Sequence, residues 1–151
     1  MHICEFEFVE DEGSYLCRPF WPGCEVCIRG EGYGDAVEQS AGWLKATVLE
    51  AIAHNGTASR PTLGHEPKHG GRVVTLAIDA SLSELPAVTG KEAAERLGVS
   101  HARISQLCSS GSLDSWTVGR TRMVTEASLN LLLSERSEAG RGRRGRVGIS
   151  A

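Results

Sequence analysis

The stretch TGKEAAERLGVSHARISQL, residues 89–107, has the pattern of two short helices joined by a tight turn. Thr89 and Glu92 have the spacing of a capping box, in which each side chain bonds the backbone N–H of the other at the start of a helix. Gly98 ends that helix, since glycine enters the left-handed backbone region with little strain. A second helix begins at Ser100, so the stretch predicts a helix-turn-helix.

The side chains of this stretch separate into an inner and an outer set. Ala94 is small, as expected where two helices cross at close range. The space between the helices is filled by Leu97, Val99, Ile104 and Leu107. The exposed side of the second helix carries Ser100, His101, Arg103, Gln106 and Ser109. The second helix of such a motif enters the major groove of DNA, where Arg103 and Gln106 can each make paired hydrogen bonds to a base edge.

A hairpin wing and a last helix are expected after this motif. Residues 116–118 and 122–124 can pair across a turn at 119–121, and Thr125 can cap the helix that follows. Arginines at the wing tip would hold phosphate or reach the minor groove. The predicted DNA-binding residues are therefore Ser100, His101, Arg103, Gln106, Ser109, Arg120 and Arg122.

The end of the chain differs in composition from the rest. After Ala139, glycine and arginine alternate, which predicts a disordered basic tail over residues 139–151. Four arginines between 141 and 146 either add phosphate contacts or serve only to keep the chain soluble. The sequence favours neither role.

Residues 1–80 predict a different kind of domain. Residues 2–9 alternate, with Cys4, Phe6 and Phe8 on one face of a strand and Glu5 and Glu7 on the other, where we expect solvent. Strands at 15–20, 24–29 and 72–79 and a helix at 34–54 follow from similar patterns. The order β-β-β-α-β, followed by a mostly helical winged motif at 85–136, predicts the α+β class with a short linker between Asp79 and Val88.

Charge is distributed unevenly along the 151 residues. Residues 1–60 contain 4 Lys and Arg against 10 Asp and Glu, whereas residues 91–151 contain 10 against 6. The basic end suits phosphates, and the acidic end suits a basic protein. No apolar run approaches the ~20 residues of a membrane span, and the acidic first residues do not resemble a secretory signal. We therefore expect a cytoplasmic protein without a membrane partner.

The cysteines and two carboxylates are candidate sites of metal binding or catalysis. Cys4, Cys17, Cys24 and Cys27 would suit tetrahedral zinc. A strand at 24–29 would, however, point Cys24 and Cys27 to opposite sides of the sheet, which argues against a metal. Glu5 and Glu7 have no third acid in pattern for metal-dependent hydrolysis. We expect no catalytic residues, no metal and no cofactor, and hence no enzyme.

Two resemblances sharpen these expectations. Residues 85–136 resemble the winged helix-turn-helix of the excisionase and MerR-like type, in which a GVS-type turn, a recognition helix and a short wing recur. A helical hairpin that makes only protein contacts is the alternative. Residues 1–61 resemble the HicB antitoxin family in the order Phe6, EDEG at 10–13, Tyr15, Pro19, PGC at 22–24, Gly30 and Asp35-Ala36.

The HicB resemblance implies a partial ribonuclease-H-like domain that covers a small basic ribonuclease toxin of the HicA type, while a second domain binds DNA. The expected function is then an antitoxin of a type II toxin-antitoxin system. It would repress its own operon by binding the operator as a dimer or tetramer. The alternative is an orphan transcription regulator or excisionase-like factor that has no toxin partner.

Overall fold

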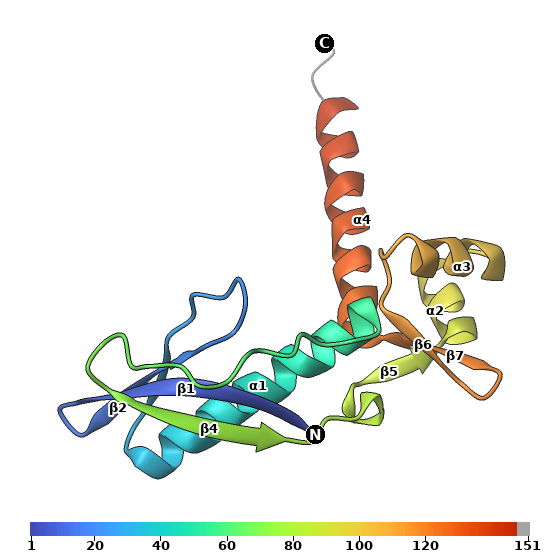
Figure 1. Cartoon of the computed structure of the whole chain (residues 1–151). Coiled ribbons are helices and arrows are strands. Elements are labelled where there is room, and N and C mark those ends of the chain that lie inside the picture. Colours follow the sequence, from blue (N-terminus) through green and yellow to red (C-terminus); the bar gives the residue numbers. More distant parts are fainter. Residues whose placement is uncertain (148–151) are drawn as a thin grey trace. The chain divides into compact units, whose positions relative to one another are not determined.

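The computed structural model describes residues 1–147, with side chains described for 1–142. It divides into two compact units, Met1–Leu82 (unit 1) and Ser83–Ala151 (unit 2), which are coloured from blue to green and from yellow to red in Figure 1. The division falls within the segment between Asp79 and Val88. Both units combine helices with a sheet, so the broad α+β class is confirmed.

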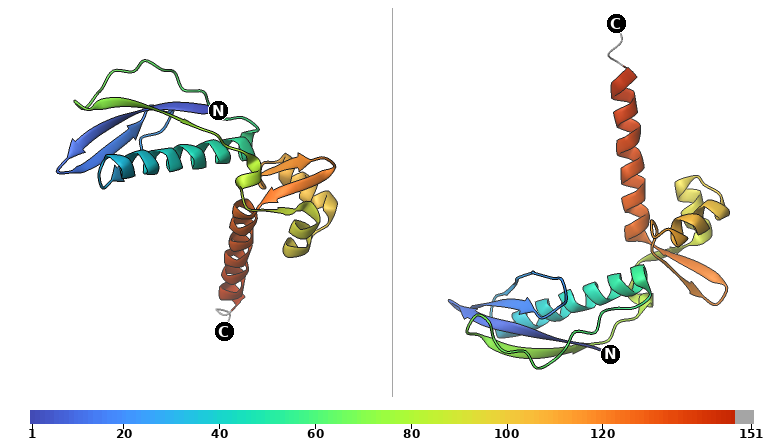
Figure 2. Two further views of the ribbon diagram at one scale, coloured as in Figure 1. Left: turned by 90° about the horizontal axis from the view of Figure 1, so that it is seen from below. Right: turned by 45° about the horizontal axis from the view of Figure 1, so that its top comes forward.

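Unit 1 is a four-stranded antiparallel sheet with one helix against it. Its elements are β1 (His2–Asp11), β2 (Ser14–Pro19), β3 (Ile28–Gly30), α1 (Tyr33–Asn55) and β4 (Arg72–Ile78). The strand order is β3-β2-β1-β4. Figure 2 shows α1 lying along one face of this sheet, and the loop between α1 and β4 on the other.

The third strand is much shorter than the predicted 24–29. It pairs with β2 from Tyr15↔Gly30 to Cys17↔Ile28, and continuing that register would place Val26 opposite Pro19. Proline has no backbone N–H to give to a neighbouring strand. The ladder therefore stops at Ile28, and the argument that strand alternation separates Cys24 from Cys27 is wrong, because neither residue lies in a strand.

The core of unit 1 lies between the sheet and α1. Cys4, Phe6 and Phe8 of β1 are buried, as the alternation predicts, against buried residues of α1 such as Leu44. The backbones approach closely at Gly30, where an added Cβ would lie 2.3 Å from the Cα of Ala36. Any larger residue there would push α1 away from the sheet.

The opposite face of β1 is not solvated, which corrects the expectation for Glu5 and Glu7. Their residues are only 7% and 1% exposed, because residues 57–71 cross this face. Glu5 accepts bonds from the backbone N–H of Gly64 (2.8 Å) and of His65 (2.9 Å), and from the His65 ring (2.7 Å). The backbone N–H groups that bond Glu7 belong to Lys68 (2.8 Å), His69 (2.8 Å) and Gly71 (3.0 Å).

These bonds change the acidity of both carboxyl groups. Burial raises the pKa of Glu7, but the N–H groups of Lys68, Gly71 and His69 outweigh burial and hold that pKa below its ordinary value. The N–H groups of Gly64 and His65 likewise lower the pKa of Glu5. Both side chains are therefore held as carboxylates that fasten the loop to the sheet.

Unit 2 is a small sheet with three helices packed on it. A 3-10 turn at Leu82–Glu84 precedes β5 (Ala87–Thr89), α2 (Gly90–Leu97), α3 (His101–Ser109), β6 (Ser115–Val118), β7 (Thr121–Thr125) and α4 (Glu126–Val147). The sheet order is β5-β7-β6. The sequence pattern had not indicated β5, whose three residues are too few to show alternation.

The last helix corrects the predicted disordered tail over the part of it that the structure describes. α4 continues through Ala139 to Val147, and residues 148–151 lie outside the described residues. Once a helix has formed, each further residue adds a hydrogen bond without a new nucleation cost. Glutamate, alanine and arginine are good helix formers, which offset the interspersed glycines. None of the helices in the described part of the chain has the length and hydropathy needed to span a bilayer.

Candidate nucleic-acid interface

The turn between α2 and α3 is built from local bonds. The Thr89 hydroxyl accepts the N–H of Glu92 at 3.2 Å, and Gly98 adopts φ 65° in the left-handed region. The N–H of Val99 reaches back to the Ala94 carbonyl at 3.0 Å. Only half of the predicted capping box is present: the Glu92 carboxylate accepts a bond from Arg96 at 2.9 Å, and Thr89 is paired with Met123 of β7.

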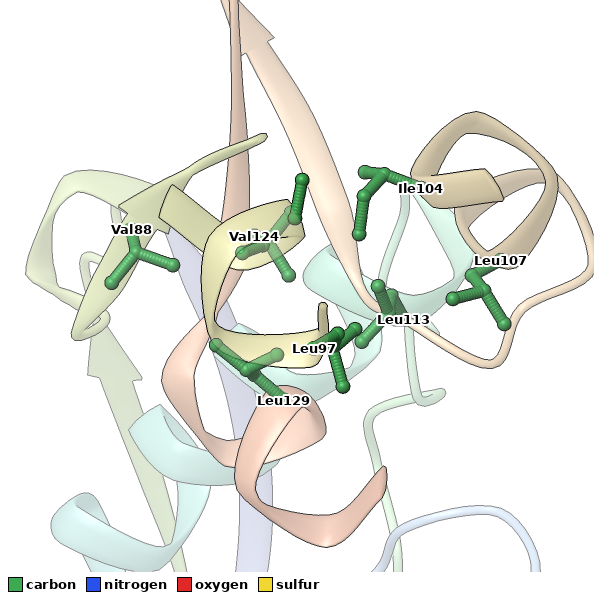
Figure 3. Close-up of a cluster of buried hydrophobic side chains, with 9 residues drawn as sticks. Val88, Leu97, Ile104, Leu107, Leu113, Val124 and Leu129 are labelled. Carbon is green, nitrogen blue, oxygen red and sulfur yellow. The ribbon is translucent and has the colours of Figure 1, made fainter. Parts of the chain in front are cut away.

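A single apolar cluster holds α2 and α3 at a fixed angle. Ala94, Leu97, Ile104 and Leu107 are buried in it, and Val99 packs against it, as the sequence predicts. Figure 3 shows side chains of α2 and α3 meeting others from the sheet and α4. The remaining buried members of the cluster are Val88, Ala93, Leu113, Val124 and Leu129.

The outer side of α3 carries the five polar residues that the sequence assigns to it. All five are exposed: Ser100, His101, Arg103, Gln106 and Ser109. Ser100 has a structural task as well, since its hydroxyl oxygen caps α3 by accepting the N–H of Arg103 at 3.2 Å. The Ser100 hydroxyl hydrogen remains free to donate to another acceptor.

Arg103 and Gln106 form a pair on this surface. An Nη1 of Arg103 donates to the Gln106 Oε1 at 3.2 Å, one helical turn away. This bond holds the guanidinium beside Gln106 and leaves its other N–H groups able to donate to a ligand. Arginine offers donors suited to guanine, and an amide offers both a donor and an acceptor.

The wing differs from its prediction in the position of one arginine. Arg120 is exposed in the turn between β6 and β7, at the tip. Arg122 is half-buried and lies beside the start of α2, where a Cβ added to Gly90 would be 3.6 Å from the Arg122 Cβ. It is therefore not a tip residue. Its register places it on the sheet face that bears Val124, toward the helices.

The set of residues predicted from the sequence lacks two further basic residues of unit 2. Lys91 is exposed in the first turn of α2, where the helix dipole disfavours a cation unless an anion is near. This unfavourable position could have identified Lys91, from the sequence, as a candidate contact to an anion. Arg136 donates from Nη1 to the Leu97 carbonyl at 3.0 Å and so ties α4 to the end of α2. Nothing in the sequence pattern joins Arg136 to a residue 39 positions earlier.

The two units differ in charge. Residues 1–82 contain 6 Lys and Arg against 12 Asp and Glu, a formal charge of −6, and residues 83–151 contain 10 against 7, a formal charge of +3.

The four cysteines of unit 1 differ in exposure: Cys4 and Cys17 are buried, Cys24 is half-buried and Cys27 is exposed. Among the described residues, no group of three or more metal-binding side chains comes together.

Comparison with known proteins bears on unit 2. Residues 87–137 match the family model described as a helix-turn-helix domain. The structure has a motif of this kind in α2 and α3. No curated protein and no solved structure matches the chain. The family match supports a DNA-binding role for unit 2.

Proposed function

We propose that this chain is a sequence-specific DNA-binding regulator that inserts α3 into the major groove. The observation that carries the proposal is the exposed polar side of α3, with Arg103 and Gln106 bonded to each other above a fully packed cluster. A rigid helix that presents a paired arginine and amide can hydrogen-bond base edges with little further ordering.

Phosphate contacts would orient α3 in the groove. Lys91 at the start of α2 and Arg120 at the wing tip are exposed cations. Arg122, half-buried beside Gly90, adds a third positive charge near the start of α2. Such contacts give affinity and register without reading sequence. Two copies would place paired α3 helices on a two-fold operator, because a single small motif contacts few bases.

The finer proposal concerns unit 1. We infer that it binds a small basic ribonuclease of the HicA type and that the chain acts in the cytoplasm as an antitoxin that represses its own operon, with no enzymatic activity of its own. The formal charge of −6 on residues 1–82 supports a basic partner, as does the resemblance of residues 1–61 to the HicB family. The alternative is a regulator that acts on DNA with no toxin.

Fluorescence anisotropy of the full chain tests DNA binding. Labelled DNA from upstream of the gene is compared with a scrambled duplex of equal length over a range of salt concentrations. We expect the upstream DNA to bind at least about 10³-fold more tightly, as specific sites do. Equal affinities on both duplexes, or no binding to either at low salt, would contradict the proposal.

A matched pair of arginine variants locates the surface. Arg103→Ala should lower affinity for the upstream DNA and leave binding to scrambled DNA nearly unchanged. Arg96→Ala is the control, because Arg96 already neutralises Glu92 (2.9 Å) and Glu126 (3.7 Å) and lies on α2. Equal losses for the two variants would mean that α3 does not read the bases.

Co-expression distinguishes an antitoxin from a regulator that has no toxin partner. Any small reading frame for a basic protein beside this gene is expressed with this chain, and the purified product is tested for ribonuclease activity and for DNA binding. A stoichiometric complex that suppresses the ribonuclease supports the antitoxin. Specific DNA binding by a chain that captures no such protein supports the regulator without a toxin.

A further inference from the structure

β4 is an open edge of the sheet in unit 1. It is the last strand in the order β3-β2-β1-β4 and pairs with β1 alone. Among the described residues, no backbone bond joins residues 72–78 to any loop. About half of the N–H and C=O groups of such a strand point away from its only neighbour. They therefore have no protein partner within the described chain.

The composition of β4 gives its edge little protection. Its sequence is RVVTLAI, with one charge at the first residue and neither lysine nor proline. Proteins usually guard exposed edges with those residues, with bulges or with very short strands. The other edge, β3, has only three residues. A seven-residue aliphatic edge instead has the character of a strand that another strand covers.

The core also remains open along β4. Val74, Leu76 and Ile78 pack against the cluster beneath α1 and are only partly buried. On the opposite face, Thr75 and Ala77 are exposed and Val73 is half-buried. A strand added beside β4 would cover Val74, Leu76 and Ile78 on the face of the sheet that packs against α1. The incoming strand therefore needs apolar side chains at every second residue, on the face that packs against α1.

We propose that β4 pairs with β4 of a second copy of this chain, joining two four-stranded sheets into one. A two-fold axis through Thr75 pairs all seven residues of the strand with those of its partner. Val74 then lies opposite Leu76 of the other copy, and the two Thr75 side chains lie opposite each other, a favourable cross-strand pair. The axis is perpendicular to the sheet, so both α1 helices cover the same face.

Charge is compatible with this register. Arg72, the one charged residue of the strand, lies opposite Ile78 of the second copy. The two Arg72 residues stand at opposite ends of the new pair of strands, about 20 Å apart at ~3.4 Å per residue. Within the two paired strands, no like charges lie opposite each other. The use of this dimer on a two-fold operator rests on the proposed function, whereas the pairing itself does not.

Sedimentation velocity of the full chain without DNA tests the pairing. The wild type should form a dimer whose population rises with concentration up to about 100 µM. Thr75→Lys places two like charges face to face on the axis and should raise the dimer dissociation constant about tenfold or more. Thr75→Val keeps a strand-forming residue of similar shape and should dimerise like the wild type.

Amide hydrogen exchange of the wild type provides a readout that needs no variant. The outward N–H groups of β4 should exchange more slowly as protein concentration rises, while those of β3 do not change. A monomeric wild type at every concentration, or an equally stable dimer in Thr75→Lys with unprotected β4 amides, would overturn the proposal. Because no DNA is present, loss of DNA binding in another experiment leaves this result unaffected.

Discussion

At the scale of single residues, Arg103 and Gln106 act as one group. Their 3.2 Å bond fixes the guanidinium before any ligand arrives. Removal of Gln106 would leave Arg103 free to sample other rotamers, so part of the effect of each substitution is shared. Residues that share a bond in this way are expected to give non-additive effects.

A double-mutant cycle on upstream DNA measures that sharing. We expect Arg103→Ala to weaken specific binding by ~1–3 kcal/mol, the usual value of one bidentate base contact. Gln106→Ala should cost less, and the double variant should lose less than the sum of the two. Strictly additive losses would show that the bond does not organise the surface.

Glu7 is the second residue at which a local change should have a clear effect. Its folded pKa lies below the ordinary value of 4.5. The carboxylate therefore stabilises the fold fully above that value, and the stabilisation is lost as pH falls through the lower, folded pKa. Acid should release residues 57–71 from the sheet, with fast amide exchange at Lys68, His69 and Gly71 as the sign.

Glu7→Gln tests this assignment at neutral pH. The amide nitrogen would face backbone N–H donors, so we expect a loss of about 1–3 kcal/mol in the free energy of unfolding. The dependence of stability on pH below about 5 should become flatter. Glu10→Gln, at an exposed position of the same strand, is the control. Urea titrations at two pH values give the measurement, and equal effects of the two substitutions would refute the role of Glu7.

At the scale of elements, the turn between α2 and α3 depends on one backbone conformation. Gly98 has φ 65°, and any side chain there meets a steric penalty. The Schellman-like bonds of the turn, including Val99 N–H to the Ala94 carbonyl, set where α3 begins. The direction of the exposed polar side of α3 therefore depends on a residue that lies outside α3.

Gly98→Ala should destabilise unit 2 by roughly 1–2 kcal/mol. The matched control is Gly42→Ala in α1, where an added Cβ meets nothing within 4 Å. There the same change should stabilise unit 1 by roughly 0.5–1 kcal/mol, because alanine favours a helix interior. Thermal melting followed by circular dichroism supplies both values. A stabilising effect at Gly98 would mean that the turn tolerates another conformation.

At the scale of the whole molecule, the chain has two separate cores. One contains Phe6 and Leu44 and the other Ile104 and Leu129, and no described cluster includes residues of both. Each core is sufficient to define a cooperative unit. Unfolding is therefore expected in two steps, for which a single melting temperature is not a meaningful quantity.

Two substitutions, one in each core, distinguish the two unfolding steps. Leu44→Ala and Ile104→Ala remove fully or nearly fully buried aliphatic side chains, 0% and 2% exposed. Each should cost 2–5 kcal/mol, roughly, in its own unit. Calorimetry should show one transition move in each variant while the other stays. Joint movement of both transitions in either variant would show that the units unfold as one.

Much of the local structure follows from the sequence alone. The helix-turn-helix, the inner set from Leu97 to Leu107 and the outer set on α3 depend on interactions within a few residues, which a sequence pattern records directly. The first hairpin and α1 follow for the same reason. The short third strand was within reach as well, since Pro19 lies in the strand that it must pair with.

Contacts between distant segments were decided only by the tertiary structure. Glu5 and Glu7 look like solvated residues until a loop about 60 positions away covers them. The bond from Arg136 to Leu97, the position of Arg122 beside Gly90 and the strand β5 have the same origin. Alternation along a strand tells which side chains share a face, but what covers that face depends on where the chain returns.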